Sequence, residues 1–204
     1  MSDTAAVTVF LIDDDEAVLK ALKRLLGAFG HHVEAHTSAE AFLKQHDPEV
    51  PGCAIVDLGL PGMDGLAVQE LLLAESVERP IIFLTGQADI PATVRAMKAG
   101  AIDFLTKPVN AASLMAAVAT AIERDAGARQ AGEERRQIEQ RIASLTARER
   151  EVLTCVVAGR LNKQIAAELG TVEKTIKVHR GRMMEKMGVR TVADLVRMSA
   201  AAHH

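Results

Sequence analysis

Four charged residues of this chain lie at or just past the ends of short apolar runs, where a parallel sheet would bring them together. Asp13 and Asp14 follow VTVFLI, Asp57 follows CAIV, and Lys107 comes just past AIDFL. Such runs are typical of strands buried on both faces of a parallel sheet, and ligands bind outside the carboxyl ends of these strands. Three carboxylates at one edge cannot all stay ionised unless a cation lies among them or some take up protons. The pattern therefore predicts a divalent-metal site.

Neighbouring motifs place further groups at the same edge. The segment DLGLPGMDG puts Asp57 before a Gly/Pro loop that leaves it accessible, FLTGQ puts Thr85 and Gly86 at the next strand end, and FLTKP puts Lys107 at the one after. Taken singly, an Asp after a strand is more often a turn or cap residue, a Lys a surface residue, and Phe104 a core residue. Their joint occurrence at successive strand ends favours a shared site.

The elements that must position these residues alternate between strand and helix. The expected strands are Val7–Ile12, Val33–His36, Ala54–Val56, Ile81–Leu84 and Ile102–Leu105. The expected helices are Glu16–Ala28, Ala39–His46, Leu66–Ser76, Pro91–Ala99 and Ala111–Ile122. Five such units predict an α/β domain, a five-stranded doubly wound parallel sheet with helices on both faces.

The chain after this domain shows only helical patterns. Residues 123–144 are charged and contain no Pro, which predicts a helical linker. Gly127 and Gly132 each cost a helix about 1 kcal/mol relative to Ala, so we expect the linker to be loose early and firmer late. A short coiled-coil dimer through the linker is a second possibility, but the apolar positions are too few to establish it.

The last part of the chain, residues 145–202, predicts an all-α domain. Gly residues separate four expected short helices: Ala147–Val157, Lys163–Leu169, Glu173–Met187 and Val192–Ala200. Thr146 followed by Glu149 fits a capping box, which marks the domain boundary at Leu145. His203 and His204 are interpreted as the remnant of a purification tag.

Charge divides the chain in the same way. Residues 1–122 hold 8 Lys/Arg against 16 Asp/Glu, whereas residues 145–204 hold 11 against 6, which suggests a polyanionic partner for the second part. No apolar run approaches the roughly 20 residues of a membrane span, and MSDTAAV does not have the pattern of a signal peptide. Cys53 and Cys155 are too few and too far apart for a disulfide framework, so we expect both to be buried in a protein of the reducing cytoplasm.

Residues 5–123, with DLGLPGMDG, FLTGQ and FLTKP in order, resemble the receiver domain of bacterial two-component response regulators, whose fold is flavodoxin-like. The resemblance implies that Asp57 accepts a phosphoryl group from a sensor histidine kinase and that Asp13, acting through water, helps to hold Mg²⁺. The implied Mg²⁺ ligands are Asp13, Asp14, Asp57 and the backbone carbonyl of Gly59. The implied phosphate-binding groups are Thr85, Gly86 and Lys107, of which Thr85 and Lys107 also assist the transfer. Thr85 and Phe104 would form the conformational switch, and the Lys107–Pro108 bond would be cis.

The segment Leu145–Val189 contains LTAREREVL, NKQIAAELG and TIKVH, and it resembles the LuxR-type helix-turn-helix domain of the NarL/FixJ regulators, most closely those of the FixJ-like branch. The resemblance implies that the helix Glu173–Met187 reads duplex DNA. The implied DNA-binding residues are Lys163, Lys174, Lys177, Val178, Arg180 and Arg182. Two departures from the family pattern are Val172, where a Ser/Thr cap is usual and for which Thr171 could substitute one residue early, and Gly181 within the reading helix.

The two resemblances together imply a cytoplasmic transcription factor that phosphorylation drives to dimerise, bind DNA and act with RNA polymerase. Such a protein is a phosphoacceptor that assists its own phosphorylation and dephosphorylation, and not an enzyme. Activation is favoured over repression. One alternative is a phosphotransferase of the haloacid dehalogenase type, although its nucleophile follows the first strand rather than the third. Another is a module whose terminal helices bind protein instead of DNA.

Overall fold

The computed structural model describes residues 6–86 and 90–201. The chain divides into two compact units, Met1–Arg129 and Gln130–His204. The expected tag remnant, His203 and His204, lies outside the described residues.

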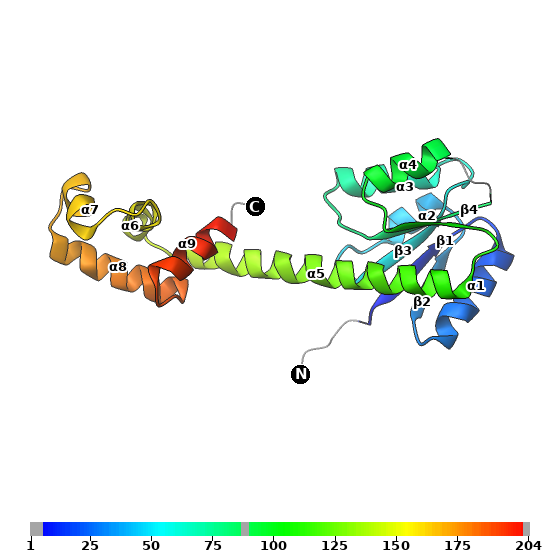
Figure 1. Ribbon diagram of the computed structural model, residues 1–204, viewed down its shortest axis with the longest axis horizontal. Coiled ribbons are helices and arrows are strands. Elements are labelled where there is room, and N and C mark those ends of the chain that lie inside the picture. Colours follow the sequence, from blue (N-terminus) through cyan, green and yellow to red (C-terminus); the bar gives the residue numbers. More distant parts are fainter. Residues whose placement is uncertain (1–5, 87–89, 202–204) are drawn as a thin grey trace. The chain divides into compact units, whose positions relative to one another are not determined.

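Five strands of the first unit form one parallel sheet in the order β2-β1-β3-β4-β5 (Figure 1). The strands are β1 (Thr8–Ile12), β2 (His32–His36), β3 (Gly52–Asp57), β4 (Ile81–Thr85) and β5 (Asp103–Thr106). This order, in which the second strand lies outside the first and the later strands follow on the other side, is that of a doubly wound sheet. It confirms the predicted fold class.

Helices cover both faces of this sheet. They are α1 (Glu16–Ala28), α2 (Ala39–Gln45), α3 (Gly65–Ala74), α4 (Ile90–Lys98) and α5 (Ala111–Ala143). Helices α1 and α5 contribute to one buried cluster, and α2, α3 and α4 contribute to the other.

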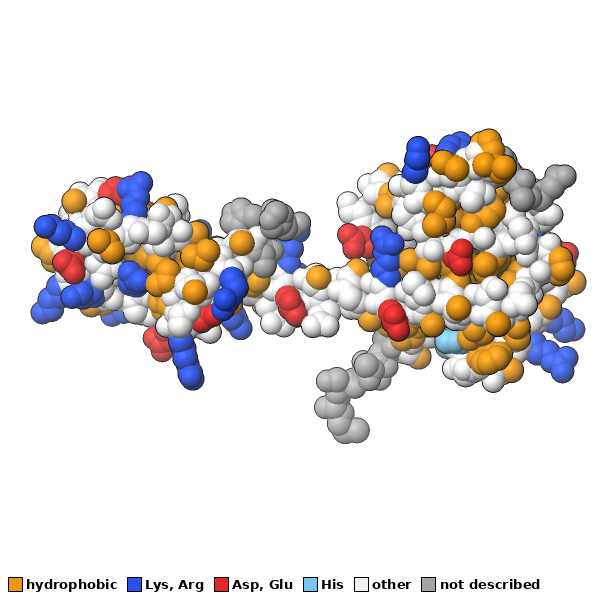
Figure 2. Space-filling model, in the orientation of Figure 1, with side chains coloured by type: hydrophobic (Ala, Val, Ile, Leu, Met, Phe, Trp, Pro, Cys, Tyr) orange, Lys and Arg blue, Asp and Glu red, His pale blue; other side chains and the backbone are white. Residues whose placement is uncertain are grey.

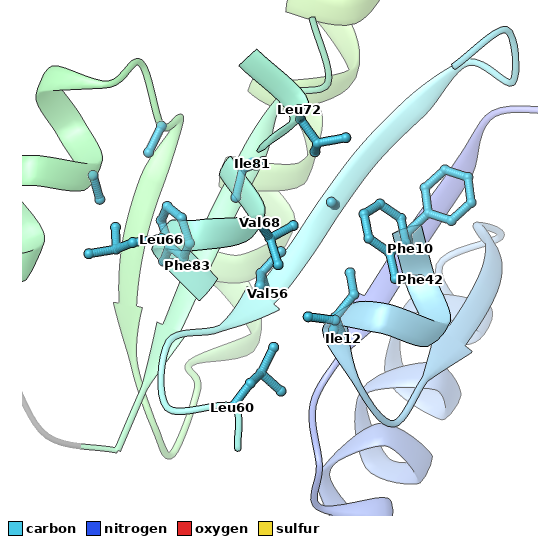
Figure 3. Close-up of a cluster of buried hydrophobic side chains, with 14 of the residues drawn as sticks. Phe10, Ile12, Phe42, Val56, Leu60, Leu66, Val68, Leu72, Ile81 and Phe83 are labelled. Carbon is cyan, nitrogen blue, oxygen red and sulfur yellow. The ribbon is translucent and has the colours of Figure 1, made fainter. Parts of the chain in front are cut away.

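The period-two alternation of strand side chains supplies a core to each face. On β1, Phe10 and Ile12 point to the α2–α4 side, and Val9 and Leu11 point to the α1–α5 side. Figure 3 shows the first of these clusters, in which Phe10, Phe42 and Phe83 lie among aliphatic side chains. The central strands β1, β3 and β4 are buried along their whole length, as the apolar runs predicted, whereas the edge strands β2 and β5 are partly exposed.

Helix α5 is longer than the sequence pattern predicted. It was expected to end at Ile122, yet it continues without a break to Ala143 and takes in the whole of the expected linker. The expectation that the linker is loose in its first half is wrong, because Asp125 is buried and Arg129 makes four hydrogen bonds within the first unit. These contacts outweigh the helix-destabilising effect of Gly127.

The second unit contains the end of α5 and four short helices. These are α6 (Ala147–Val157), α7 (Asn162–Glu168), α8 (Glu173–Met187) and α9 (Val192–Ala201). The predicted capping box of Thr146 and Glu149 is present. Helix α8 begins at Glu173 with Val172 as an N-cap that has no side-chain hydrogen bond, so the expectation that Thr171 caps this helix one residue early is wrong. Ile165, Ile176, Met183 and Met187 lie in the core of this unit.

Across residues 6–86 and 90–201, none of the helices combines the length and the apolar character that crossing a bilayer requires.

Candidate functional site

The aspartates predicted to meet at one edge of the sheet do so. Ile12, the last residue of β1, is aligned with Val56 on β3, so Asp13 and Asp57 both follow this aligned pair. Asp13, Asp14 and Asp57 each offer a carboxylate oxygen, and these oxygens lie within 4.8 Å of one another. Asp13 and Asp57 are buried, and Asp14 is exposed.

The backbone around Asp57 holds its carboxylate in a fixed position. The amide of Gly59 donates to Asp57 Oδ2 at 3.1 Å, and the amide of Leu58 donates to the carbonyl of Leu84 at 2.8 Å. A Cβ atom on Gly65 would lie 2.6 Å from the carbonyl oxygen of Asp57. The loop of residues 58–64 can therefore close against the strand only because residue 65 has no side chain.

Asp13 is held from two directions. Its Oδ1 accepts a hydrogen bond from the amide of Asp15 at 3.0 Å, and its own amide donates to the carbonyl of His36 at 3.2 Å. Its buried Oδ2 forms an ion pair with Lys107 Nζ at 2.6 Å. Asp15 also caps α1, since its side chain accepts from the amides of Ala17 and Val18.

Lys107 bridges two of the carboxylates. Its Nζ lies 2.6 Å from Asp13 Oδ2 and 2.8 Å from Asp57 Oδ1. Partial burial disfavours the ammonium, but the bonds to Asp13 and Asp57 outweigh it, so the pKa of Lys107 lies above its ordinary value. The backbone amide of Lys107 donates to the carbonyl of Thr85 at 2.7 Å, and the Lys107–Pro108 bond is cis, as predicted.

The donor set fits a hard divalent cation. Three carboxylates with one ammonium leave an excess of negative charge at a largely buried site, which either a cation or protonation must compensate. All of the donors are oxygen atoms, as Mg²⁺ requires, and exposed Asp14 leaves one side open to water.

The remaining predicted residues of this site lie at the ends of β4 and β5. Thr85 is the last residue of β4 and is buried. Among the described residues, no atom lies within 4 Å of the place that a Cβ on Gly86 would take. Phe104 is partly buried, with its ring centroid 6.3 Å from that of Phe83.

Positive side chains spread over the second unit, as Figure 2 shows for one face. Within the part of the chain that the structure describes, Lys163, Lys174 and Arg182 are exposed and have no hydrogen-bond or ion-pair partner. Lys177 forms an exposed pair with Glu173 at 3.6 Å, and 47% of Val178 is exposed. These side chains are accessible to a polyanion.

Arg180 differs from the other predicted DNA-binding residues. It is partly buried, and its guanidinium donates to Asn162 Oδ1 at 2.8 Å. This bond joins the start of α7 to the middle of α8, the two helices of the expected helix-turn-helix. Arg180 therefore has a structural contact in addition to any contact with DNA.

Two cations that the motifs did not single out join α5 to α8 reciprocally. Arg141 on α5 donates to the carbonyl of Met187 at 3.0 Å, and Lys186 on α8 donates to the carbonyl of Ser144 at 3.1 Å. Cations at helix carboxyl ends are favourable because the last carbonyls have no helical partner.

Lys186 also forms an ion pair with the buried Glu149 at 2.7 Å. This pair, and then the bond from the amide of Thr146, lower the pKa of Glu149 to about 2. A buried capping-box glutamate needs a cation, and this requirement could have pointed to Lys186.

Comparison with known proteins assigns each unit to a family. Residues 9–119 match the response regulator receiver domain, and residues 143–199 match the luxR family of bacterial regulatory proteins. Nodulation protein W of Bradyrhizobium diazoefficiens is 44% identical over 94% of this chain and 84% of its own length. The regulatory protein FixJ of Azorhizobium caulinodans is 41% identical over 97% of this chain and 93% of its own length.

A solved structure supports the same assignment. The response regulator StyR is 46% identical, has a TM-score of 0.87, and is matched over 96% of this chain and 99% of that one. The fold, the order of the two domains and these relatives agree with both resemblances seen in the sequence. The chain is a two-component response regulator that combines a receiver domain with a LuxR-type helix-turn-helix DNA-binding domain, and it belongs to the group that includes FixJ.

Proposed function

We propose that this protein is a phosphorylation-controlled transcription factor in which Asp57 accepts the phosphoryl group of a sensor histidine kinase. The observation that carries the proposal is the ammonium of Lys107, which bridges Asp13 and Asp57 at the carboxyl edge of the sheet. A positive group fixed beside a nucleophilic carboxylate is what the transfer of an anionic phosphoryl group requires.

In the proposed reaction, an oxygen of Asp57 attacks the phosphorus of the kinase's phosphohistidine. The P–O bond forms, the P–N bond breaks, and the imidazole leaves with the bonding electron pair and takes up a proton. Lys107, the hydroxyl of Thr85 and the amide of Gly86 would bind phosphoryl oxygens, and among the described residues no atom would crowd a Cβ at residue 86.

Mg²⁺ would be held by Asp13 through water, by Asp14 and Asp57, and by the carbonyl of Gly59. When bound, it would neutralise charge on the phosphoryl oxygens. The carboxylate oxygens within 4.8 Å of one another support this set. The same groups would assist hydrolysis of the phosphoaspartate, so the protein resets itself without turning over an external substrate.

The output would follow from the switch pair. Thr85 moves toward the phosphoryl group and Phe104 turns into the space that is vacated. The face formed by α4, β5 and α5 then changes and promotes a homodimer. This dimer would act with RNA polymerase in the cytoplasm.

In the dimer, the two α8 helices would read paired half-sites in duplex DNA. Lys177 and Val178 would contact bases, and Lys163, Lys174, Arg180 and Arg182 would contact phosphates. We propose the domains as 1–122, 123–144 and 145–202, with activation as the outcome.

The assignment of Asp57 as the acceptor is tested by incubating the protein with acetyl phosphate. The fraction of phosphorylated protein is measured by intact-protein mass spectrometry. Asp57→Asn should abolish uptake, and chelation of Mg²⁺ should suppress it in the unmodified protein. Asp64→Asn is the matched control, because Asp64 lies in the same loop and caps α3, and Asn caps a helix as well as Asp does. Uptake by Asp57→Asn equal to that of the control would refute the acceptor assignment.

A further inference from the structure

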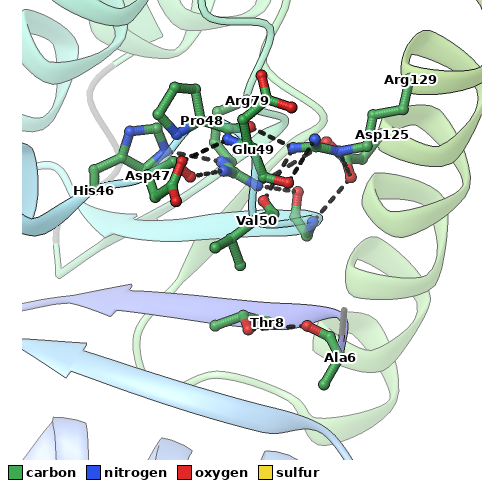
Figure 4. Close-up of polar contacts among 11 residues, drawn as sticks. Ala6, Thr8, His46, Asp47, Pro48, Glu49, Val50, Arg79, Asp125 and Arg129 are labelled. Carbon is green, nitrogen blue, oxygen red and sulfur yellow. Dashed lines mark hydrogen bonds and ion pairs between the residues drawn. The ribbon is translucent and has the colours of Figure 1, made fainter. Parts of the chain in front are cut away.

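Three charged residues fix α5 to the edge of the receiver sheet opposite the aspartate cluster. Arg79, Asp125 and Arg129 form this group, which we call the anchor (Figure 4). Asp125 and Arg129 lie beyond residue 119, where the receiver family match ends. The anchor is therefore separate from the phosphoryl site and lies outside the family pattern in two of its three residues.

Arg129 binds three consecutive carbonyls of the loop between α2 and β3. Its guanidinium donates to the carbonyls of Pro48, Glu49 and Val50 at 2.7, 3.0 and 2.9 Å, and to Asp125 Oδ2 at 2.8 Å. The planar fork of an arginine can make these bonds together, whereas a lysine ammonium cannot reproduce the geometry. Arg129 thus ties α5 to the loop that leads into β3, and Arg79 holds the same loop through the carbonyl of Asp47 at 3.1 Å.

Asp125 and Arg79 continue the anchor into the interior. Asp125 is 3% exposed, accepts from the amide of Gly52 at 2.9 Å, and lies 4.0 Å from Arg79. The side chain of Arg79 is fully buried and donates to the carbonyl of Gly52 and to His46 Nε2, at 3.1 and 3.0 Å. A Cβ atom on Gly52 would lie 1.8 Å from the carbonyl oxygen of Thr8, so this close approach needs glycine.

The anchor joins α5 to the two strands that carry the phosphoryl site. Gly52 is the first residue of β3, which ends at Asp57, and Arg79 lies just before β4, which ends at Thr85. Buried charges are costly unless they are fully paired, so the anchor holds its elements in one arrangement rather than a range of them.

We propose that Arg79, Asp125 and Arg129 are positioning residues that make residues 123–129 move with the receiver, and that this attachment is required for phosphorylation of Asp57 to change DNA binding. The second half of the proposal rests on the proposed function. The first half stands on the contacts alone and is tested without phosphorylation.

Amide hydrogen exchange of the full-length protein tests the attachment. Arg129→Ala should speed exchange roughly tenfold or more in residues 123–130 and 47–51, because it removes several hydrogen bonds of a charged group. Arg129→Lys should behave nearly like Arg129→Ala. The matched control is Arg135→Ala, since Arg135 is on the same helix in an exposed pair with Glu139. Equal exchange in Arg129→Ala and the control, or a uniform rise across all five strands, would overturn the attachment.

DNA affinity with and without acetyl phosphate tests the second half. Arg129→Ala should take up phosphate at the unmodified rate, because the anchor does not touch the phosphoryl site, yet lose most of the gain in DNA affinity. If the unmodified protein gains affinity and Arg129→Ala gains as much, the requirement for the anchor fails while the proposed function stands. If the unmodified protein itself gains nothing, the proposed function and this requirement fail together.

Discussion

The two domains use charge in opposite ways. In the receiver, Asp13 and Asp57 are buried and Lys107 is partly buried. The ammonium of Lys107 lies within 2.8 Å of a carboxylate oxygen of each aspartate and compensates their negative charge. In the helix-turn-helix domain, the cations expected to meet DNA are exposed except for Arg180, and Lys163, Lys174 and Arg182 have no partner within the described residues. Charge in the receiver is thus partly compensated within its own site, whereas the exposed positive charge of the second domain is left available to a large polyanion.

A second distinction lies among the cations of the helix-turn-helix domain itself. Arg141 and Lys186 are committed to backbone carbonyls, and Arg180 bonds Asn162 in addition to its proposed contact with DNA. A basic composition alone does not separate such structural cations from those free to bind phosphate, whereas the contacts do. The predictions below test these two contrasts.

Apart from loss of the acceptor Asp57 itself, the largest effect on phosphorylation is expected at Lys107. Replacing it with Ala leaves Asp13 and Asp57 uncompensated and removes the fixed positive group, so the rate of phosphate uptake should fall on the order of a hundredfold or more. The measurement is the initial rate of phosphorylation by acetyl phosphate at fixed Mg²⁺. Lys23→Ala, at an exposed position on α1, is the control and should be unchanged. A Lys107→Ala rate equal to that of the control would contradict the preorganised site.

Buried and exposed ion pairs should differ strongly in their contribution to stability. Asp125→Ala leaves the fully buried Arg79 without its carboxylate and should lower the free energy of unfolding by about 3–5 kcal/mol. Glu139→Ala, which breaks the exposed pair with Arg135, should cost less than about 0.5 kcal/mol. Urea titration of the full-length variants measures both, and similar losses would show that burial is not what distinguishes them.

Sequence reasoning anticipated what depends on local pattern. The short apolar runs predicted all five strands, and the motifs predicted the meeting of Asp13, Asp14 and Asp57. It failed at α5, where two glycines suggested looseness, because long-range contacts from Arg129 to the loop at residues 48–50 decide the outcome. Such contacts join residues about 80 positions apart, and no helical or strand periodicity encodes them.

Acid should weaken the two domains over different pH ranges. Burial and the charge of Arg79 lower the pKa of His46 to about 4. Below about pH 6.5, the unfolded chain therefore binds more protons at His46 than the folded receiver does. The receiver loses stability as the pH falls from about 6.5 to about 4. Bonds from Lys186 and then Thr146 lower the pKa of Glu149 to about 2. The stability that Glu149 gives the second domain is present above about pH 4.5 and is lost as pH falls toward 2.

Hydrogen exchange in each domain as a function of pH, corrected for the intrinsic rate, measures these losses. His46→Gln should flatten the receiver profile between pH 6.5 and 4, with His31→Gln as its control, and Glu149→Gln should flatten only the profile of the second domain. Profiles that fall together in all variants would show that neither group controls its domain.

The smallest effect is expected for single cations on the DNA-binding surface. Lys174→Ala or Arg182→Ala should weaken binding to any duplex sequence a few-fold and reduce the slope of log affinity against log salt by about 1. Arg136→Ala is the control, since this exposed residue of α5 pairs with Glu133. An unchanged salt slope for both variants would place the DNA-binding surface elsewhere.

The central claim, that the receiver site controls the DNA-binding domain, is tested most directly by the affinity of the full-length protein for duplex DNA. The affinity is measured in Mg²⁺ with and without acetyl phosphate, for the unmodified protein and for Asp57→Asn. Phosphodonor should raise the affinity of the unmodified protein and leave that of Asp57→Asn unchanged. An equal rise in both proteins, or no rise in either, would contradict the account.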